Sequence, residues 1–198
     1  GGGDVYVNPV IMDFEDLVRI VREEVKQNPE LNPEHLTPAA EEKIDEVLDA
    51  AEQRTEGGAQ TNAQSSLTLG KAALLRMRLK YAESYFNSAI EVFSKIRDTR
   101  GKATAMDYLS RTRRKMGDYE TAVRLQNQSM DLRIALRDRK GEAQSLNELG
   151  NLAHLEFKNE EAFEYHTKAL EIRQEIGDDE GVAASLNNLG NIEIRKGN

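Results

Sequence analysis

The sequence of 198 residues has no cysteine and no tryptophan. Without cysteine there can be no disulfide framework, no thiolate zinc or iron–sulfur site and no cysteine nucleophile. No run approaches the roughly 18 consecutive apolar residues that a membrane-spanning helix needs. Hydrophobic residues make up 38% of the chain, which is enough to build a core. We therefore expect an ordinary globular protein of a reducing compartment, the cytoplasm, without a membrane span.

Catalytic and metal-binding motifs are missing as well. The sequence contains no Gly-rich phosphate loop, no nucleophile elbow, no His-Glu-x-x-His and no calcium-binding loop. A metal site built on His154 and His166 would need a third ligand that the sequence does not indicate. The carboxylate pair Glu160 and Glu161 fits a helix start better than acid–base chemistry. We predict that the chain is not an enzyme and holds neither a metal nor a cofactor.

Charge is distributed unevenly along the chain. Residues 1–60 hold 5 basic and 15 acidic side chains, residues 61–140 hold 17 and 8, and residues 141–198 hold 5 and 12. The net charges of the three segments are therefore −10, +9 and −7. This pattern indicates either attraction between segments of the chain or a basic middle that attracts an acidic ligand.

The sequence repeats itself at an offset of 40 residues. Three landmarks keep this spacing: Gly101, Gly141 and Gly181; Leu69, Leu109, Leu149 and Leu189; and Ala82, Ala122 and Ala162. Apolar residues within each unit follow helical spacing, so each unit is predicted to be two helices. We expect full repeats at 61–100, 101–140 and 141–180, and the first helix of a fourth at 181–198.

Breaks and small residues predict how the two helices of a repeat meet. Asp118, after Gly117, and Asn159 are expected to cap second helices. Small residues are expected where the helices of a hairpin approach closely, at Gly150, Gly190, Ala162 and Ala169. The fourth repeat lacks its second helix, which predicts a fragment with an exposed apolar end at Leu186, Leu189 and Ile192. Such an end could pair two copies as a homodimer.

These residues resemble the tetratricopeptide repeats, which have Leu-Gly in the first helix and two alanines in the second. Leu149-Gly150 with Ala162 and Ala169 fill those positions, as do Leu69-Gly70 with Ala82 and Ala89. The 40-residue period is similar to that of Pins/LGN-type adaptors and of many prokaryotic signalling proteins. The resemblance implies an all-α protein, a right-handed α-solenoid of antiparallel helix pairs.

Residues 1–60 do not follow the repeat and are predicted to form a helical pair. The first helix is expected over 13–27, capped by Asp13, and the second begins after Thr37, with Pro38 in its first turn. Residues 54–61 contain Gly57-Gly58 and are expected to be a linker. This acidic pair is predicted either to cap the solenoid end or to act as an autoinhibitor in the groove.

The resemblance implies that the first helix of every repeat lines a concave groove. The implied groove residues, repeat by repeat, are Leu67, Lys71, Leu74 and Leu75; Asp107, Arg111, Arg114 and Lys115; Asn147, Asn151, His154 and Leu155; and Asn187, Asn191, Ile194 and Arg195. The four-residue spacing of the asparagines stacks them one turn apart, as a ladder that could pair with a peptide backbone. The basic residues would select acidic side chains.

The leading functional hypothesis is a protein-binding adaptor whose groove holds an extended, acidic peptide. The basic segment 61–140 leaves an RNA-binding solenoid as one alternative, although its tyrosines are expected to pack between helices rather than to stack on bases. A ligand-sensing regulatory arm of a larger signalling protein is the other alternative.

Overall fold

The computed structural model describes residues 14–27, 36–56 and 62–196, and these residues form helices and no strand. The helices are α1 Phe14–Gln27, α2 Pro38–Glu56, α3 Ala63–Leu75, α4 Leu79–Lys95, α5 Thr99–Lys115, α6 Tyr119–Ala135, α7 Arg139–Leu155, α8 Asn159–Glu175 and α9 Asp179–Lys196. In the parts of the chain that the structure describes, no helix is long and apolar enough to cross a membrane.

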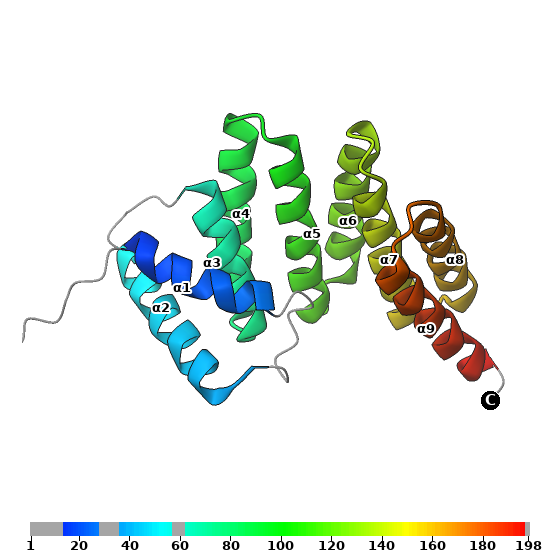
Figure 1. Ribbon diagram of the computed structural model, residues 1–198, viewed down its shortest axis with the longest axis horizontal. Coiled ribbons are helices and arrows are strands. Elements are labelled where there is room, and N and C mark those ends of the chain that lie inside the picture. Colours follow the sequence, from blue (N-terminus) through cyan, green and yellow to red (C-terminus); the bar gives the residue numbers. More distant parts are fainter. Residues whose placement is uncertain (1–13, 28–35, 57–61, 197–198) are drawn as a thin grey trace, which may run out of the picture.

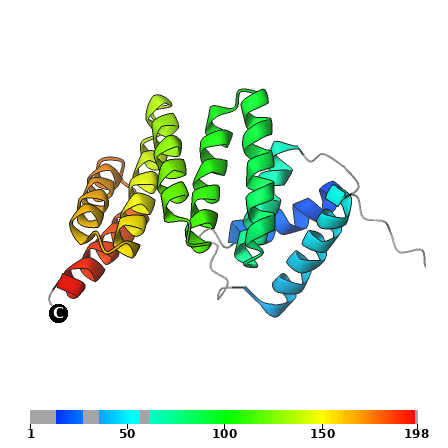
Figure 2. The ribbon, with the colours of Figure 1, turned by 180° about the vertical axis from the view of Figure 1, so that it is seen from behind.

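From α3 onward, each helix packs on the next, and the antiparallel hairpins stand in a row (Figure 1). Helices α3, α5, α7 and α9 are the first helices of the four repeats, and α4, α6 and α8 are the second helices. Figure 2 shows the same row from behind, with α9 at the end opposite α1 and α2. The predicted all-α solenoid is therefore confirmed.

The turns between helices recur every 20 residues, twice as often as the sequence repeat. One residue in each turn has a positive φ: Met77, Arg97, Gly117, Arg137, Phe157 and Gly177. This left-handed conformation ends one helix, and the following residue is the N-cap of the next. Asp118 is such a cap, as predicted, and its carboxylate accepts a hydrogen bond from the backbone N–H of Thr121 at 3.2 Å.

The prediction that Asn159 is an N-cap is wrong by one residue. Lys158 occupies the N-cap of α8 and makes no side-chain cap hydrogen bond, whereas Asn159 is the first residue of the helix. The 20-residue period of the turns explains the shift, because Phe157 takes the left-handed position that Gly117 and Gly177 take elsewhere. Glu160 and Glu161 lie in the first turn of α8, where carboxylates favour the helix dipole.

The two helices of a hairpin meet at the predicted glycines. A Cβ added at Gly70 would lie 2.5 Å from the Phe86 ring, and one at Gly150 would lie 2.7 Å from the His166 ring. Any side chain at either position would force the helices apart. A Cβ at Gly190 meets nothing within 4 Å, so the predicted close approach is not observed there. Its counterparts face the second helix of their repeat, and no described helix follows α9.

The C-terminal end is only partly exposed, contrary to prediction. Leu186 is exposed, but Ile192 is buried and clusters with Ala153 and Ala162. The reason is that α9 packs on α8, which covers the face that carries Ile192.

Successive repeats meet at junctions that change in chemistry along the chain. At the first junction the ring of Phe93 lies against Gly101. At the second, Arg133 of α6 donates hydrogen bonds to the Gly141 carbonyl at 2.7 Å and to Ser145 Oγ at 3.1 Å. At the third, Arg173 of α8 donates to the Gly181 carbonyl at 2.9 Å and to Ser185 Oγ at 2.7 Å. Phe93, Arg133 and Arg173 are therefore repeat equivalents, 40 residues apart.

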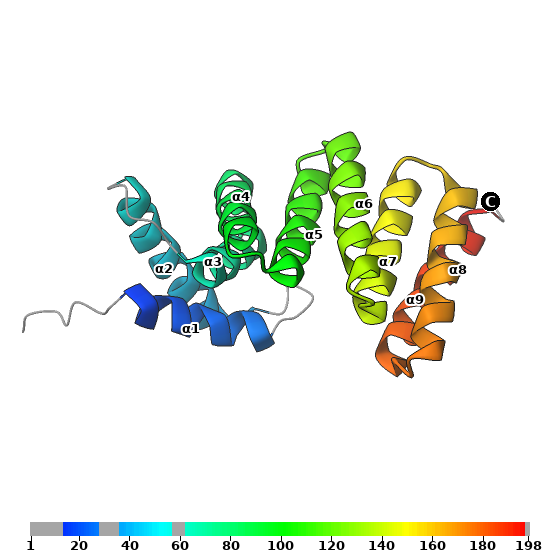
Figure 3. The same cartoon turned by 90° about the horizontal axis from the view of Figure 1, so that it is seen from above.

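The N-terminal pair packs on the first repeat. Thr37 caps α2 as predicted, since Ala40 N donates to Thr37 Oγ1 at 3.2 Å. Helix α1 packs on α3 and lies on the side of α3 that faces away from α4 (Figure 3). Val21 and Val25 of α1 share one hydrophobic core with the first repeat, and this core is listed here by its other members from α2: Ile44, Val47, Leu48 and Ala51. Asp13, the linker glycines and the side chains of residues 14–18 lie outside the described residues.

Ion pairs fix α2 to the turn between α3 and α4. Arg76 lies 3.1 Å from Glu41 and 2.9 Å from Asp45. Arg78 lies 3.3 Å from Asp45 and 2.7 Å from Asp49. The acidic N-terminal segment and the basic middle therefore attract each other at this turn, which was one of the two interpretations of the uneven charge.

Candidate functional site

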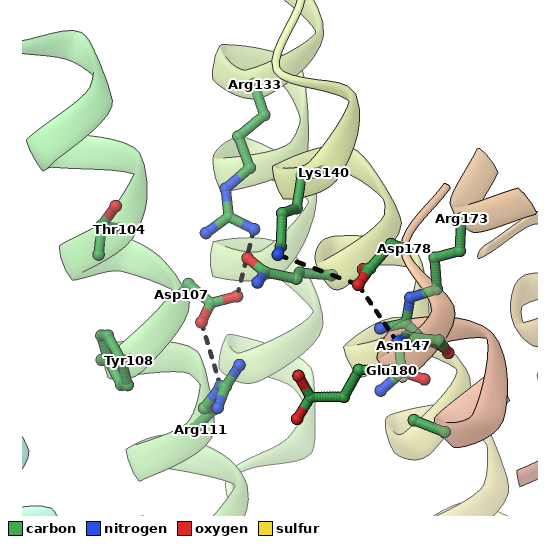
Figure 4. Close-up of a pocket in the computed structure, with 13 residues that line it drawn as sticks. Thr104, Asp107, Tyr108, Arg111, Arg133, Lys140, Asn147, Arg173, Asp178 and Glu180 are labelled. Carbon is green, nitrogen blue, oxygen red and sulfur yellow. Dashed lines mark hydrogen bonds and ion pairs between the residues drawn. The ribbon is translucent and has the colours of Figure 1, made fainter. Parts of the chain in front are cut away.

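A polar pocket of about 420 Å³ opens on the inner face of the solenoid (Figure 4). It spans three repeats, because α5, α7 and α9 all contribute to it, together with one arginine each from α6 and α8. Its lining residues are Thr104, Asp107, Tyr108, Arg111, Arg133, Lys140, Gln144, Asn147, Arg173, Asp178, Glu180, Gly181 and Ala184.

Three of the predicted groove residues line this pocket: Asp107, Arg111 and Asn147. The predicted residues that do not line it are Lys71, Arg114, Lys115, Asn151, His154, Asn187 and Asn191. The side chain of Arg195 lies outside the described residues. Leu67, Leu74 and Leu75 are buried in the core that the first repeat shares with the N-terminal helices, and are not open to a groove.

Asp107 is the buried centre of the pocket wall, with a side chain that is only 4% exposed. Its carboxylate lies 3.0 Å from Arg111 Nε and 3.7 Å from Arg133 Nη1, and it accepts a hydrogen bond from Gln126 Nε2 at 3.0 Å. Burial by itself would raise the pKa of Asp107, but the two arginines and the Gln126 amide together hold it below its ordinary value. Asp107 is therefore an ionised group that neutralises two cations.

Glu148 is a second buried carboxylate, which the sequence analysis missed. It lies 3.4 Å from Arg114 and 3.9 Å from Arg111, and it accepts a hydrogen bond from Asn151 Nδ2 at 3.3 Å. Its repeat equivalents are Thr68, Tyr108 and Asn188, so no recurrence marked the position. Arg111 and Arg114, predicted to attract an acidic ligand, are thus paired with carboxylates of the chain itself.

Tyr108 connects the pocket to the first repeat. Its ring stacks on Phe86 with centroids 5.6 Å apart, and Lys71 and Arg111 lie 4.6 and 5.2 Å from its centroid. Lys71 is therefore held by a cation–π contact rather than extended into the pocket. The Tyr108 ring packs between helices, as the sequence analysis expected of the tyrosines in this segment.

The predicted asparagine ladder is broken into separate contacts. Asn147 Oδ1 accepts a hydrogen bond from Asn188 Nδ2 at 2.9 Å, and Asn151 bonds to Glu148. Asn187 and Asn191 are exposed on α9. Asn147 alone among these four lines the pocket.

The two histidines of the repeats have separate environments. His166 is buried, and the loss of solvation, with smaller effects from His154 and Arg173, lowers its pKa to about 4. His154 is only partly buried. Among the residues that the structure describes, no group of histidine and carboxylate side chains could hold a metal ion.

Comparison with known families accounts for this architecture. The sequence model of the tetratricopeptide repeat matches residues 61–135 and 141–198, which is more than half of the chain. The chain belongs to the tetratricopeptide repeat family. Tetratricopeptide repeat proteins are typically scaffolds without enzymatic activity. A search of curated proteins gave no match.

Solved tetratricopeptide repeat structures have the same fold at low sequence identity. The apo form of RapI superposes with a TM-score of 0.74 at 12% identity, over 93% of this chain and 64% of that chain. A putative kinesin light chain from Podosopora anserina gives 0.64 at 15% identity, over 93% and 87% of the two chains for one crystal structure at a TM-score of 0.63 and 93% and 86% for the other at 0.64. MamA gives 0.56 at 18% identity, over 84% and 92%. The chain thus spans about two thirds of RapI.

Part of the pocket in this tetratricopeptide repeat protein comes from the second helices, where sequence reasoning did not look. Arg133 and Arg173 recur at the 40-residue offset and were a readable signal. Thr104 and Gln144 also recur, one helical turn before Asp107 and Asn147. The first-helix positions that the family implied therefore locate the face correctly but not the full lining.

Proposed function

We propose that the chain is a protein–protein interaction module that binds an extended, acidic peptide segment of a partner on its inner face. The observation that carries this proposal is the pocket itself. Four cationic side chains line it, namely Arg111, Arg133, Lys140 and Arg173, against the three carboxylates of Asp107, Asp178 and Glu180. The surplus positive charge favours an acidic occupant.

The lining suits a peptide in extended conformation. The pocket crosses α5, α7 and α9, so an occupant that fills it contacts three consecutive repeats. Gln144 and Asn147 carry amides, and Thr104 carries a hydroxyl, so donors and acceptors are both present for a peptide backbone. Backbone contacts of this kind tolerate many side chains, while the cations provide selection.

The proposal is tested by selecting binders from a random peptide library with the full chain. Peptides rich in Asp and Glu are expected to be enriched, and their binding should weaken as salt concentration rises. Lys140 extends over the pocket with a 65% exposed side chain, so Lys140→Glu should weaken binding about tenfold, a change of about 1.4 kcal/mol.

Lys168→Glu is the matched control. Lys168 is exposed on α8 and does not line the pocket, so the same charge change there should leave affinity nearly unaltered. Enrichment of neutral or basic peptides, or equal loss in both variants, would refute an acidic peptide on this face. Arg111→Glu is unsuitable, because Arg111 lies beside Asp107 and Glu148 and the new carboxylate would disturb the fold.

A further inference from the structure

Arg133 and Arg173 provide a comparison within one molecule. Both guanidinium groups are nearly buried, and both donate to the carbonyl of the glycine eight residues later and to the serine hydroxyl twelve residues later. Each also has the N-cap aspartate of the following helix nearby, since Asp138 crowds Gly141 with Arg133, and Asp178 crowds Gly181 with Arg173. The surroundings supplied by the following helix are therefore the same for both arginines.

The two arginines differ at one position of the preceding first helix. Asp107 places a carboxylate 3.7 Å from Arg133. The equivalent residue 40 positions later is Asn147, which presents a neutral amide of the same shape. Figure 4 shows Asn147 and Arg173 toward the α9 end of the pocket, and both line it. The third repeat thus keeps the buried arginine and replaces the acid by an amide.

We propose that a carboxylate of the bound partner occupies the Asn147–Arg173 end of the pocket and supplies there the charge that Asp107 supplies to Arg133. This inference rests on the proposed function and names the chemical group that the pocket selects. Arginine remains charged at any accessible pH, and a buried cation is stabilised by an anion that also forms hydrogen bonds.

The orientation of Asn147 is compatible with such an occupant. Its Oδ1 accepts from Asn188 Nδ2 at 2.9 Å, which fixes the amide with Nδ2 as the remaining donor, and no described residue accepts a hydrogen bond from that Nδ2. A carboxylate can accept from an amide N–H and from a guanidinium at once, because its two oxygens together offer about four acceptor sites. Asp107 does the same in the second repeat, where Gln126 is the amide donor and Arg111 and Arg133 are the cations.

The test follows the arginine Nε–Hε signals of the full chain by NMR during titration with defined probes. The probes are pentaglutamate with both ends blocked, pentaglutamine with a free C-terminal carboxylate, and inorganic phosphate. We expect at least one of the two peptides to shift the Arg173 signal at millimolar concentration and to leave the Arg133 signal in place. The first peptide reports a side-chain carboxylate and the second a chain terminus.

Asn147→Asp is the deciding variant. It places the chain's own carboxylate in the proposed site without changing shape, so it should weaken binding of the responsive peptide about tenfold and abolish the Arg173 shift. Asp107→Asn is the reciprocal variant, and where it folds it should add a peptide-dependent shift of Arg133. Asn187→Asp is the control, because Asn187 is exposed and does not line the pocket.

An unchanged Arg173 shift in Asn147→Asp, a shift produced by phosphate alone, or no shift with any probe would each overturn the proposal. These results are distinguishable from a failure of the proposed function. Enrichment of acidic library peptides without a shift of Arg173 would preserve the function and refute this site. A shift of Arg173 without any library enrichment would preserve the carboxylate site and refute peptide binding.

Discussion

Protonation of His166 should make the protein sensitive to mild acid. Its side chain is 2% exposed and packs against Gly150, and its pKa is lowered from 6.5 to about 4. The unfolded chain therefore binds a proton at His166 below about pH 6.5, while the folded chain does so only near pH 4. Stability is full above pH 6.5, falls as the pH drops through this window, and loses nothing more to this group below pH 4.

The size of the effect follows from the difference in pKa. A shift of about 2.5 units corresponds to about 3 kcal/mol at full protonation, and at pH 5 about 2 kcal/mol of that is already lost. The main contribution of Asp107 lies outside this window, because the pKa of an unfolded aspartate is about 3.9 and that of Asp107 is lower still. The range between pH 7.5 and 5 therefore reports mainly on histidine.

The assay is urea unfolding at pH 7.5 and pH 5, followed by circular dichroism, for the parent chain and for His166→Phe. Phenylalanine is the residue of the first repeat at this position, where Phe86 packs on Gly70 in the same way. The variant should lose about 2 kcal/mol less than the parent between the two pH values. His154→Gln is the control and should keep most of the acid sensitivity, because burial is the largest cause of the lowered pKa. Equal losses in the parent and in a folded His166→Phe would refute the reasoning.

Three further predictions concern stability. Asp107→Asn removes the carboxylate between two buried arginines and should cost about 3 kcal/mol in urea unfolding at neutral pH; a loss below about 0.5 kcal/mol would contradict the ion-pair network. Phe157→Gly relieves a left-handed residue whose side chain is 81% exposed, so thermal melting should show a gain of about 0.5–1 kcal/mol rather than a loss. Gly150→Ala should cost about 1–3 kcal/mol, because its Cβ would lie 2.7 Å from the His166 ring, and an unchanged melting temperature would show that the hairpin can open there.

The repeat architecture was predictable because helical repeats depend on local spacing. The 40-residue offset of leucine, alanine and glycine gave the helix pairs, and Gly70 and Gly150 indeed lie where two helices touch. The 20-residue period of the turns was not readable. Only two of the six left-handed residues are glycine, and the others, such as Phe157, carry no local signal for that conformation.

The inner face was predictable only in part, because its charges are arranged by contacts between distant residues. Arg111 reads as a free basic residue in the sequence, yet it lies beside Asp107 one turn away and near Glu148 in the next repeat. Glu148 itself is a single departure from the repeat, so periodicity could not mark it. Asn147 was found from the family pattern, but its relation to Arg173 depends on how two helices pack.

The junctions between repeats also restrict the order of the repeats. Phe93 closes the first junction with an aromatic ring, whereas Arg133 and Arg173 close the later ones through a serine hydroxyl and a backbone carbonyl. A second helix that ends in phenylalanine would leave the serine of a later repeat without its guanidinium partner, and an arginine placed at the first junction would meet Ala105 instead of a serine. Duplicating the third repeat within the row should therefore be tolerated, while exchanging it with the first should not. The chain carries its own assembly order in residues that no ligand touches, so the inner face is free to change its specificity during evolution without the row of repeats being rearranged.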